Sequence, residues 1–313
     1  MSSIKHWDSL QSLTSHQIYV ESNLRRMISH PLGITHLWVL VEGEADMYLY
    51  ERMFDTYTVK VVRAGRYNKR GDVIGGVHAV KEVVEHLLAL GISQLIIGII
   101  DRDWRMFYKN AQKELPANIF LTDHRDLEMT LLSVKQVRNL MVAEIISNMS
   151  TDSVRALGGR GFFPPLWIKC CDISRYIGSL RIVAAYYQLP RFDFGETLYW
   201  NQTLKCVVPQ WEQNIFNKAF ELSSPVCKIK FLFYCWMTKV RFGLNRLSVF
   251  DVCRGHDFLH ILSVMLIDTS HFSEKWMTYF MAKEIPEAEI RELTMYKSID
   301  NWMKKNGVNR LAF

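Results

Sequence analysis

Two uninterrupted apolar runs limit the folds that this chain can adopt. THLWVLVEG covers residues 35–43 and QLIIGII covers residues 94–100, and acidic residues end or follow each run. A continuous apolar strand is typical of a parallel sheet covered on both faces. Two further strands are predicted at YTVKVVRAG and ANIFLTD, residues 57–65 and 117–123. Strands alternating with helices from about residue 34 to 140 predict an α/β fold with a parallel sheet.

The segments between these strands carry helical periodicity. Residues 45–54 are expected to form a first helix. Asp72 is expected to cap a second helix, which Gly91 would end. A third helix is expected to begin near Asp126, in DLEMTLLSVKQVRNLM. The apolar stripe of the second helix would be Val73, Val77, Val80, Val84 and Leu87.

Three regions follow along the chain. Residues 1–33 are expected to be a polar helical lead-in, and residues 34–140 the α/β domain. The alternation of strands and helices fades afterwards, so residues 141–313 are expected to form a mainly helical C-terminal domain. Its aromatic side chains suit a surface for a dimer or for docking a partner.

Composition excludes several classes of protein. The 313 residues are 49% hydrophobic and 22% charged, an ordinary globular balance that argues against disorder. No stretch reaches the roughly 18 apolar residues of a membrane span, and no signal pattern opens the chain. Six scattered cysteines suit free thiols in a reducing compartment, so we expect a cytoplasmic protein. The net charge of +6 permits a nucleic-acid partner without requiring one.

Acidic residues follow three of the predicted strands. Glu42 ends the first apolar run, Asp101 and Asp103 follow the second, and Glu128 follows the last strand. The carboxyl ends of parallel strands share one sheet edge, where such sheets place ligands. Asp46 lies one helical turn beyond Glu42. Because carboxylate oxygens suit hard cations, Glu42, Asp101 and Asp103 are candidate ligands for Mg²⁺ or Mn²⁺.

A simpler interpretation of the same residues has no metal. Acidic residues are common at helix starts, so Glu42, Asp46 and Glu128 can cap helices. Asp101 and Asp103 can be turn residues. For any one of them this interpretation is the more economical, whereas the shared edge of the whole set favours a metal site.

VEGEADMYLYERMF followed by GIIDRDW resembles the TOPRIM fold of topoisomerases, primases and nucleases of the overcoming-lysogenization-defect group. A Glu after the first strand and D-x-D after the third is the signature of that fold. With RAGRYNKRGDV between them and HRDLE downstream, the chain is most similar to stand-alone TOPRIM proteins, a family that includes the nuclease effector of PARIS anti-phage systems. The resemblance covers residues 34–135.

The resemblance implies a Mg²⁺-dependent endonuclease that cleaves DNA or RNA such as tRNA. It implies functional acids at Glu42, Asp101 and Asp103, support from Asp46, and an ABC- or SMC-like ATPase partner. A homodimer is expected by analogy. Related nucleases use an additional lysine, for which Lys228, Lys230 and Lys239 are candidates by position. Glu128 is a further catalytic candidate, although Met129 stands where related sequences often have Asn.

The loop RAGRYNKRGD supplies candidate substrate-binding residues, Arg66, Lys69 and Arg70. They can bind phosphates, with Tyr67 available to stack on a base, or form only a solvated basic turn. His256 and His260 have the spacing of a zinc pair but no evident third ligand, and Asp257 can approach the acidic site. A primase-like nucleotidyl transferase and a non-catalytic, metal-stabilised binding module are alternative functions.

Overall fold

The computed structural model describes residues 18–30, 33–103, 115–157, 159, 161–186, 243, 246–266 and 272–308. They belong to two compact units that do not follow chain order. The first unit comprises Met1–Asp101, Glu114–Asp123 and Ile285–Phe313, and the second comprises Arg102–Lys113 and His124–Glu284. The first therefore takes its last segment from the region predicted as a separate C-terminal domain.

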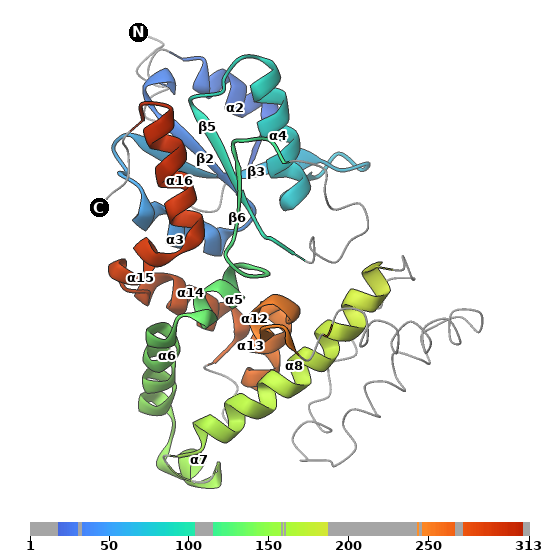
Figure 1. Ribbon diagram of the computed structural model, residues 1–313, viewed down its shortest axis with the longest axis vertical. Helices are drawn as coiled ribbons and strands as arrows, with labels where there is room; N and C mark the ends of the chain where they lie inside the picture. Colours follow the sequence, from blue (N-terminus) through green and yellow to red (C-terminus); the bar gives the residue numbers. More distant parts are fainter. Residues whose placement is uncertain are drawn as a thin grey trace, which may run out of the picture. The chain divides into compact units, whose positions relative to one another are not determined.

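The first unit is built on a six-stranded sheet in the order β1-β3-β2-β5-β6, with β4 paired to β3 (Figure 1). All pairings are parallel except that of β4 with β3. The expected α/β fold with a parallel sheet is confirmed. The strands are β1 (Ile18–Val20), β2 (Leu37–Val41), β3 (Val59–Tyr67), β4 (Val73–Ile74), β5 (Ile96–Ile100) and β6 (Ile119–Leu121).

The central strands β2 and β5 are apolar because both faces of the sheet are covered. Every residue of both strands is buried. On one face α4 packs closely over β5, and Gly98 permits this approach. A Cβ on Gly98 would lie 2.8 Å from Cγ1 of Val80 and 3.0 Å from Cγ2 of Val84. The sequence pattern of two continuous apolar runs therefore reports burial on both faces.

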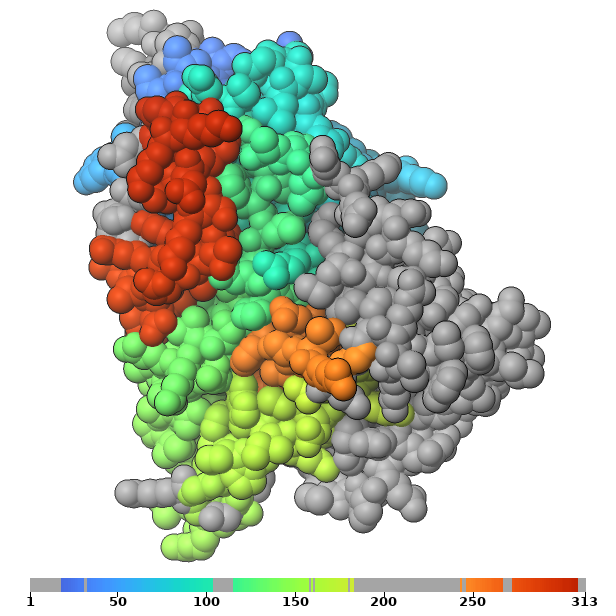
Figure 2. Space-filling view, viewed as in Figure 1, coloured from blue at the N-terminus to red at the C-terminus, as the bar shows by residue number. Residues whose placement is uncertain are grey.

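Helices surround this sheet within the first unit. Near the C-terminus α16 packs on β6, where the rings of Phe120 and Trp302 meet edge to face with centroids 6.3 Å apart. Figure 2 shows the C-terminal residues, in red, directly beside the green residues around β6. The helical elements of this unit are α2 (Glu21–Ile28), the 3₁₀ turn η1 (Gly33–Thr35), α3 (Glu44–Met53), α4 (Val77–Ala89), α15 (Glu287–Glu292) and α16 (Thr294–Lys305).

Three local features of this unit differ from the prediction. Val73 and Ile74 form β4 rather than the start of a helix, and α4 begins only at Val77, after Gly76 with φ +94°. The side chain of Asp72 accepts a hydrogen bond from Asn68 Nδ2 at 3.0 Å, so it closes a hairpin turn instead of capping a helix. The expected helical lead-in contains the strand β1, which pairs with β3.

Every secondary-structure element described in the second unit is a helix, as expected. Asp126 caps α5 by accepting a hydrogen bond from the backbone N–H of Met129 at 3.0 Å. Lys228, Lys230 and Lys239 lie outside the described residues. The helices are α5 (Leu127–Ser133), α6 (Lys135–Asn148), α7 (Thr151–Ala156), α8 (Phe163–Tyr186), α12 (Val249–Val252), α13 (Gly255–Met265) and α14 (Glu274–Glu284).

In the part of the chain that the structure describes, no helix combines the length and apolar character needed to cross a bilayer.

Candidate functional site

Glu42 and Asp101 are joined at the carboxyl edge of the sheet. Glu42 follows β2 and Asp101 follows β5, and these two strands are parallel neighbours. The backbone N–H of Asp101 donates a hydrogen bond of 2.8 Å to Oε1 of Glu42. The structure thus brings together two of the three predicted metal ligands.

Asp46 fixes the turn between Glu42 and α3. Its Oδ2 accepts a hydrogen bond of 2.7 Å from the backbone N–H of Gly43. A carboxylate in the first turn also interacts favourably with the positive end of the helix dipole. The interpretation of Asp46 as a helix-capping residue is confirmed, and the cap orients the segment that carries Glu42.

Tyr50 is a buried residue of this site that the sequence analysis did not identify. Its hydroxyl is buried and has no hydrogen-bond partner in the described part of the chain. Burial raises the pKa of this hydroxyl well above its ordinary value, and the negative charges of nearby carboxylates raise it further. These carboxylates belong to Asp46, Asp101, Glu42 and Asp123.

Asp123 was also not predicted as a site residue, although it ends the expected strand ANIFLTD. Its two carboxylate oxygens accept hydrogen bonds from the backbone N–H groups of Thr294 and Met295, at 2.6 and 2.7 Å. Asp123 therefore holds the start of α16, and its negative charge also acts on Tyr50. Its position at the end of a predicted strand was the sequence signal that could have identified it as a site residue.

The donor set fits a hydrated magnesium ion better than a closed metal cage. Within the described ranges, no group of three or more His, Cys, Asp or Glu side chains is arranged to hold a metal ion. Mg²⁺ usually takes one or two protein carboxylates and keeps several waters. Glu42 and Asp101 supply that number, and the hydroxyl of Tyr50 offers a buried donor beside them.

Asp103, the third predicted metal ligand, belongs to the second unit. Its backbone N–H donates to the carbonyl oxygen of Arg125 at 2.7 Å. Its φ is +51°, a left-handed conformation that Asp tolerates better than most residues. Asp103 is thus held in a tight turn, as the simpler interpretation expected. That Asp103 and Asp101 could share a metal ion is inferred only from their spacing in the sequence.

Glu128 is buried in the first turn of α5, in the second unit. Its Oε1 lies 3.7 Å from Nε2 of His256, and Nδ1 of His256 contacts Glu274. Burial lowers the pKa of His256 and the charge of Arg254 lowers it further. His256 and His260 belong to no three-residue metal group among the described residues, so a zinc site gains no support.

A buried ionic network surrounds this part of the second unit. Asp257 pairs with Arg181 through Oδ1 and Nη2 at 3.0 Å and through Oδ2 and Nε at 2.9 Å. Burial lowers the pKa of Arg125, while the charges of Asp126, Asp103 and Asp257 oppose that shift. The network links the turn of Asp103 electrostatically to α13, which begins at Gly255.

The three predicted substrate-binding residues lie on the hairpin formed by β3 and β4. Arg66 forms an ion pair with Glu82 of α4 at 3.3 Å. Lys69 and Arg70 are exposed in the turn, where Oδ1 of Asn68 accepts hydrogen bonds from the N–H groups of Arg70 and Asp72. The basic turn is therefore ordered and solvated, with its cations accessible to a polyanion.

Comparison with known proteins adds no assignment, since no family model, curated protein or solved structure matches the chain.

Proposed function

We propose that this protein is a Mg²⁺-dependent endonuclease of the TOPRIM type. The observation that carries the proposal is the hydrogen bond between the Asp101 backbone and Glu42, which joins the ends of two parallel strands. The buried Tyr50 hydroxyl among carboxylates supports a hydrated cation at the same edge. A D-x-D after β5 and a Glu after β2 match the order of the TOPRIM signature.

Each residue has a distinct role in this proposal. Glu42 and Asp101 would hold Mg²⁺. Asp103 is proposed as a third ligand on sequence grounds alone, because it follows Asp101 in the D-x-D motif. When bound, Mg²⁺ would activate a water and stabilise the leaving oxygen of a phosphodiester. Asp46 keeps Glu42 in position through the cap at Gly43. Glu128 is proposed as a supporting acid.

The basic hairpin would supply contacts to the substrate backbone. Arg66, Lys69 and Arg70 carry positive charge on the hairpin formed by β3 and β4, and β3 is the strand beside β2. Contacts of this kind give affinity that falls with salt and is largely independent of sequence. The net charge of +6 is compatible with a nucleic-acid substrate.

The biological role is proposed from the resemblance alone. The nuclease would be a toxic effector of anti-phage defence in the cytoplasm, held inactive by an ABC- or SMC-like ATPase until infection. Transfer RNA is the leading substrate and DNA the second, and a homodimer would pair two sites across the nucleic acid. An enzyme that cuts the nucleic acid of its own cell requires such restraint.

The test combines growth with direct cleavage. Bacteria would express the native chain, Glu42→Gln, Asp101→Asn or Glu44→Gln, alone and with candidate ATPase partners, and total RNA and DNA would be separated on gels. We expect growth arrest and cut nucleic acid from the native chain and from Glu44→Gln, the matched control two residues beyond Glu42. The purified chains would be assayed with Mg²⁺ and with EDTA.

Two results would overturn the proposal. Cleavage that persists in folded Glu42→Gln and Asp101→Asn proteins would show that these carboxylates are not catalytic. Toxicity without cut nucleic acid would favour a binding function. In the culture that expresses the native chain, the gels show whether RNA or DNA is cut and so identify the substrate class.

A further inference from the structure

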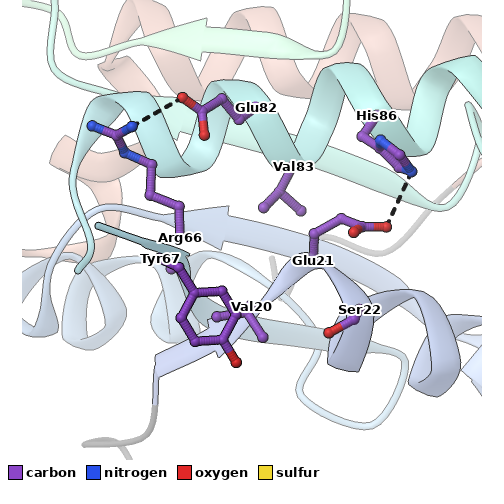
Figure 3. Close-up of a pocket in the computed structure, with 9 residues that line it drawn as sticks. Val20, Glu21, Ser22, Arg66, Tyr67, Glu82, Val83 and His86 are labelled. Carbon is purple, nitrogen blue, oxygen red and sulfur yellow. Dashed lines mark hydrogen bonds and ion pairs between the residues drawn. The ribbon is translucent and has the colours of Figure 1, made fainter. Parts of the chain in front are cut away.

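A cavity of about 270 Å³ opens at the carboxyl ends of β1 and β3 (Figure 3). Its apolar lining comes from Val20 at the end of β1, Gly65 on β3 and Val83 on α4. Val20 and Gly65 are paired across the two strands. Ligand cavities are commonly about 300 Å³ or larger, so this one suits a single flat ring system rather than a whole cofactor.

Two ion pairs stand on either side of this apolar lining. Arg66 Nη1 lies 3.3 Å from Glu82 Oε1, and His86 Nε2 lies 3.2 Å from Glu21 Oε1. Figure 3 shows the pairs on opposite sides of Val83. Glu82 and His86 are four residues apart on α4, which separates them by about 6 Å along the helix axis.

Within the described ranges, one hydrogen-bonding group of the cavity is unused. Nε of Arg66 is shielded from solvent and has no hydrogen-bond partner among the residues that the structure describes. A ligand acceptor would satisfy this donor, whereas the carboxylates of Glu21 and Glu82 can accept from ligand N–H groups. The cavity thus offers a donor and acceptors around an apolar centre.

Tyr67 adds an aromatic surface at the mouth. It ends β3, and 62% of it is exposed. Aromatic side chains beside basic grooves stack on the bases of single-stranded nucleic acids. A planar heterocycle could contact this ring with one face while its edge reaches the carboxylates.

We propose that this cavity binds one nucleobase of the polynucleotide substrate and prefers bases with an exocyclic amino group. This inference rests on the nuclease proposed above and adds a base-recognition subsite to it. Adenine, cytosine and guanine carry amino donors for Glu21 and Glu82, whereas uracil carries none. Each amino base also presents a ring or carbonyl acceptor for Arg66.

The position of the cavity suits a base close to the scissile phosphate. Glu42 follows β2, which pairs with β3, so the cavity lies one to two strand spacings away, about 5–10 Å. A Cβ on Gly75 would lie 3.1 Å from the carbonyl oxygen of Glu42, so the end of the hairpin packs on the Glu42 backbone. At about 3.4 Å per stacked nucleotide, the recognised base lies within three nucleotides of the cut.

Mononucleotide binding tests the subsite without catalysis. Ligand-observed NMR titrations would use CMP against UMP and GMP against IMP, pairs in which one member lacks the amino group, in EDTA and with full-length protein. We expect CMP and GMP to bind at least fivefold more tightly than UMP and IMP. The double variant Glu21→Ala with Glu82→Ala removes both acceptors and should reduce both ratios to within twofold.

Tyrosine variants test the stacking surface. Tyr67→Ala should weaken binding of CMP and GMP at least fivefold. The matched control is Tyr57→Ala, because Tyr57 is 87% exposed and precedes β3 at the opposite end of the strand. Equal effects of the two substitutions would overturn the role of Tyr67 and with it the placement of the base in this cavity.

The outcomes separate this inference from the proposed function. Equal affinity for CMP and UMP and for GMP and IMP, or no binding of any mononucleotide, overturns the subsite even if the native chain cleaves nucleic acid. Amino-base binding that depends on Glu21 and Glu82 supports the subsite. If such binding is found and the chain still cleaves nothing, the nuclease proposal fails on its own.

Discussion

The backbone N–H of Asp101 donates to the side chain of Glu42 across 2.8 Å, and this bond joins the ends of β5 and β2. It gives Glu42 a structural role that is separable from its charge. A neutral side chain of the same shape can still accept the bond, whereas only a carboxylate contributes a full negative charge to a cation.

Glu42→Gln and Glu42→Ala should therefore differ in stability but not in activity. Glutamine keeps an acceptor for the Asp101 N–H, so we expect a free energy of unfolding within about 1 kcal/mol of the native value. Alanine leaves that N–H without its acceptor and should cost about 1–3 kcal/mol. Both should lose Mg²⁺-dependent cleavage. Urea denaturation and a cleavage assay measure the two properties, and full activity in Glu42→Gln would contradict the role given to its charge.

The Arg181–Asp257 pair should be among the costliest contacts to break in the second unit. Both side chains are largely buried and meet through two short contacts. Removing one partner leaves a buried charge, so Asp257→Ala should destabilise the protein by about 3–5 kcal/mol. The exposed pair of Arg155 and Asp152 is the control, and Asp152→Ala should cost less than about 1 kcal/mol.

Chemical denaturation of the single and double variants of each pair measures both coupling energies. Coupling of the buried pair no larger than that of the exposed pair would mean that solvent already screens Arg181 and Asp257.

Gly255 should tolerate no side chain. A Cβ there would lie 2.3 Å from Cβ of Glu128 and 2.7 Å from Oδ1 of Asp126. The Gly255 N–H also donates to Oδ2 of Asp126 at 2.8 Å, so the start of α13 cannot move away without losing this bond. We expect Gly255→Ala to cost at least about 1–3 kcal/mol. Gly161→Ala is the matched control, because a Cβ there meets no atom of the described residues within 4 Å. A thermal-shift comparison that found the two variants equal would contradict this packing.

Parts of the fold were predictable because local pattern and tertiary environment agree. β2 and β5 are continuous apolar runs, and both are buried on both faces. β1 and β4 are only three and two residues long, and each becomes a strand through pairing with β3. Neither segment carries a periodic pattern of its own, so both were predicted to be helical.

The candidate site was predictable to the extent that strand ends define it. Glu42 and Asp101 follow from the edge rule for parallel sheets. Asp103 and Glu128 belong to a different compact unit from Glu42, a division that spacing along the chain does not reveal. Tyr50 was missed because a tyrosine in a helix is ordinary until packing buries its hydroxyl, here without a hydrogen-bond partner in the described ranges.

The thiol of Cys171 should react slowly with alkylating agents under native conditions. Burial raises its pKa from 9.0 to about 11, with Arg175 opposing the shift. A raised pKa means less thiolate at neutral pH, so alkylation at pH 8 should be about 100-fold slower than for an ordinary thiol. The rate should rise about tenfold per pH unit until pH 11. Peptide mass spectrometry after iodoacetamide pulses, with a urea-unfolded sample as control, measures it. A plateau near pH 9 would contradict the burial of this thiol.

Tyr50→Phe tests whether the buried hydroxyl serves a hydrated cation. In EDTA the hydroxyl has no hydrogen-bond partner to lose among the described residues, so its removal should leave the free energy of unfolding within about 1 kcal/mol or raise it. With Mg²⁺ present, a ligand that binds only the folded state raises the melting temperature. That rise should be smaller in Tyr50→Phe, because a water held by the cation loses the hydrogen bond that the Tyr50 hydroxyl donates.

The control is Tyr48→Phe, since Tyr48 lies on the same helix and is 40% exposed. Its melting temperature should rise with Mg²⁺ as much as that of the native protein. An equal Mg²⁺-induced rise in all three proteins would mean that Tyr50 does not contact the hydrated ion. A loss of stability in EDTA would instead show that its hydroxyl has a partner in the folded chain.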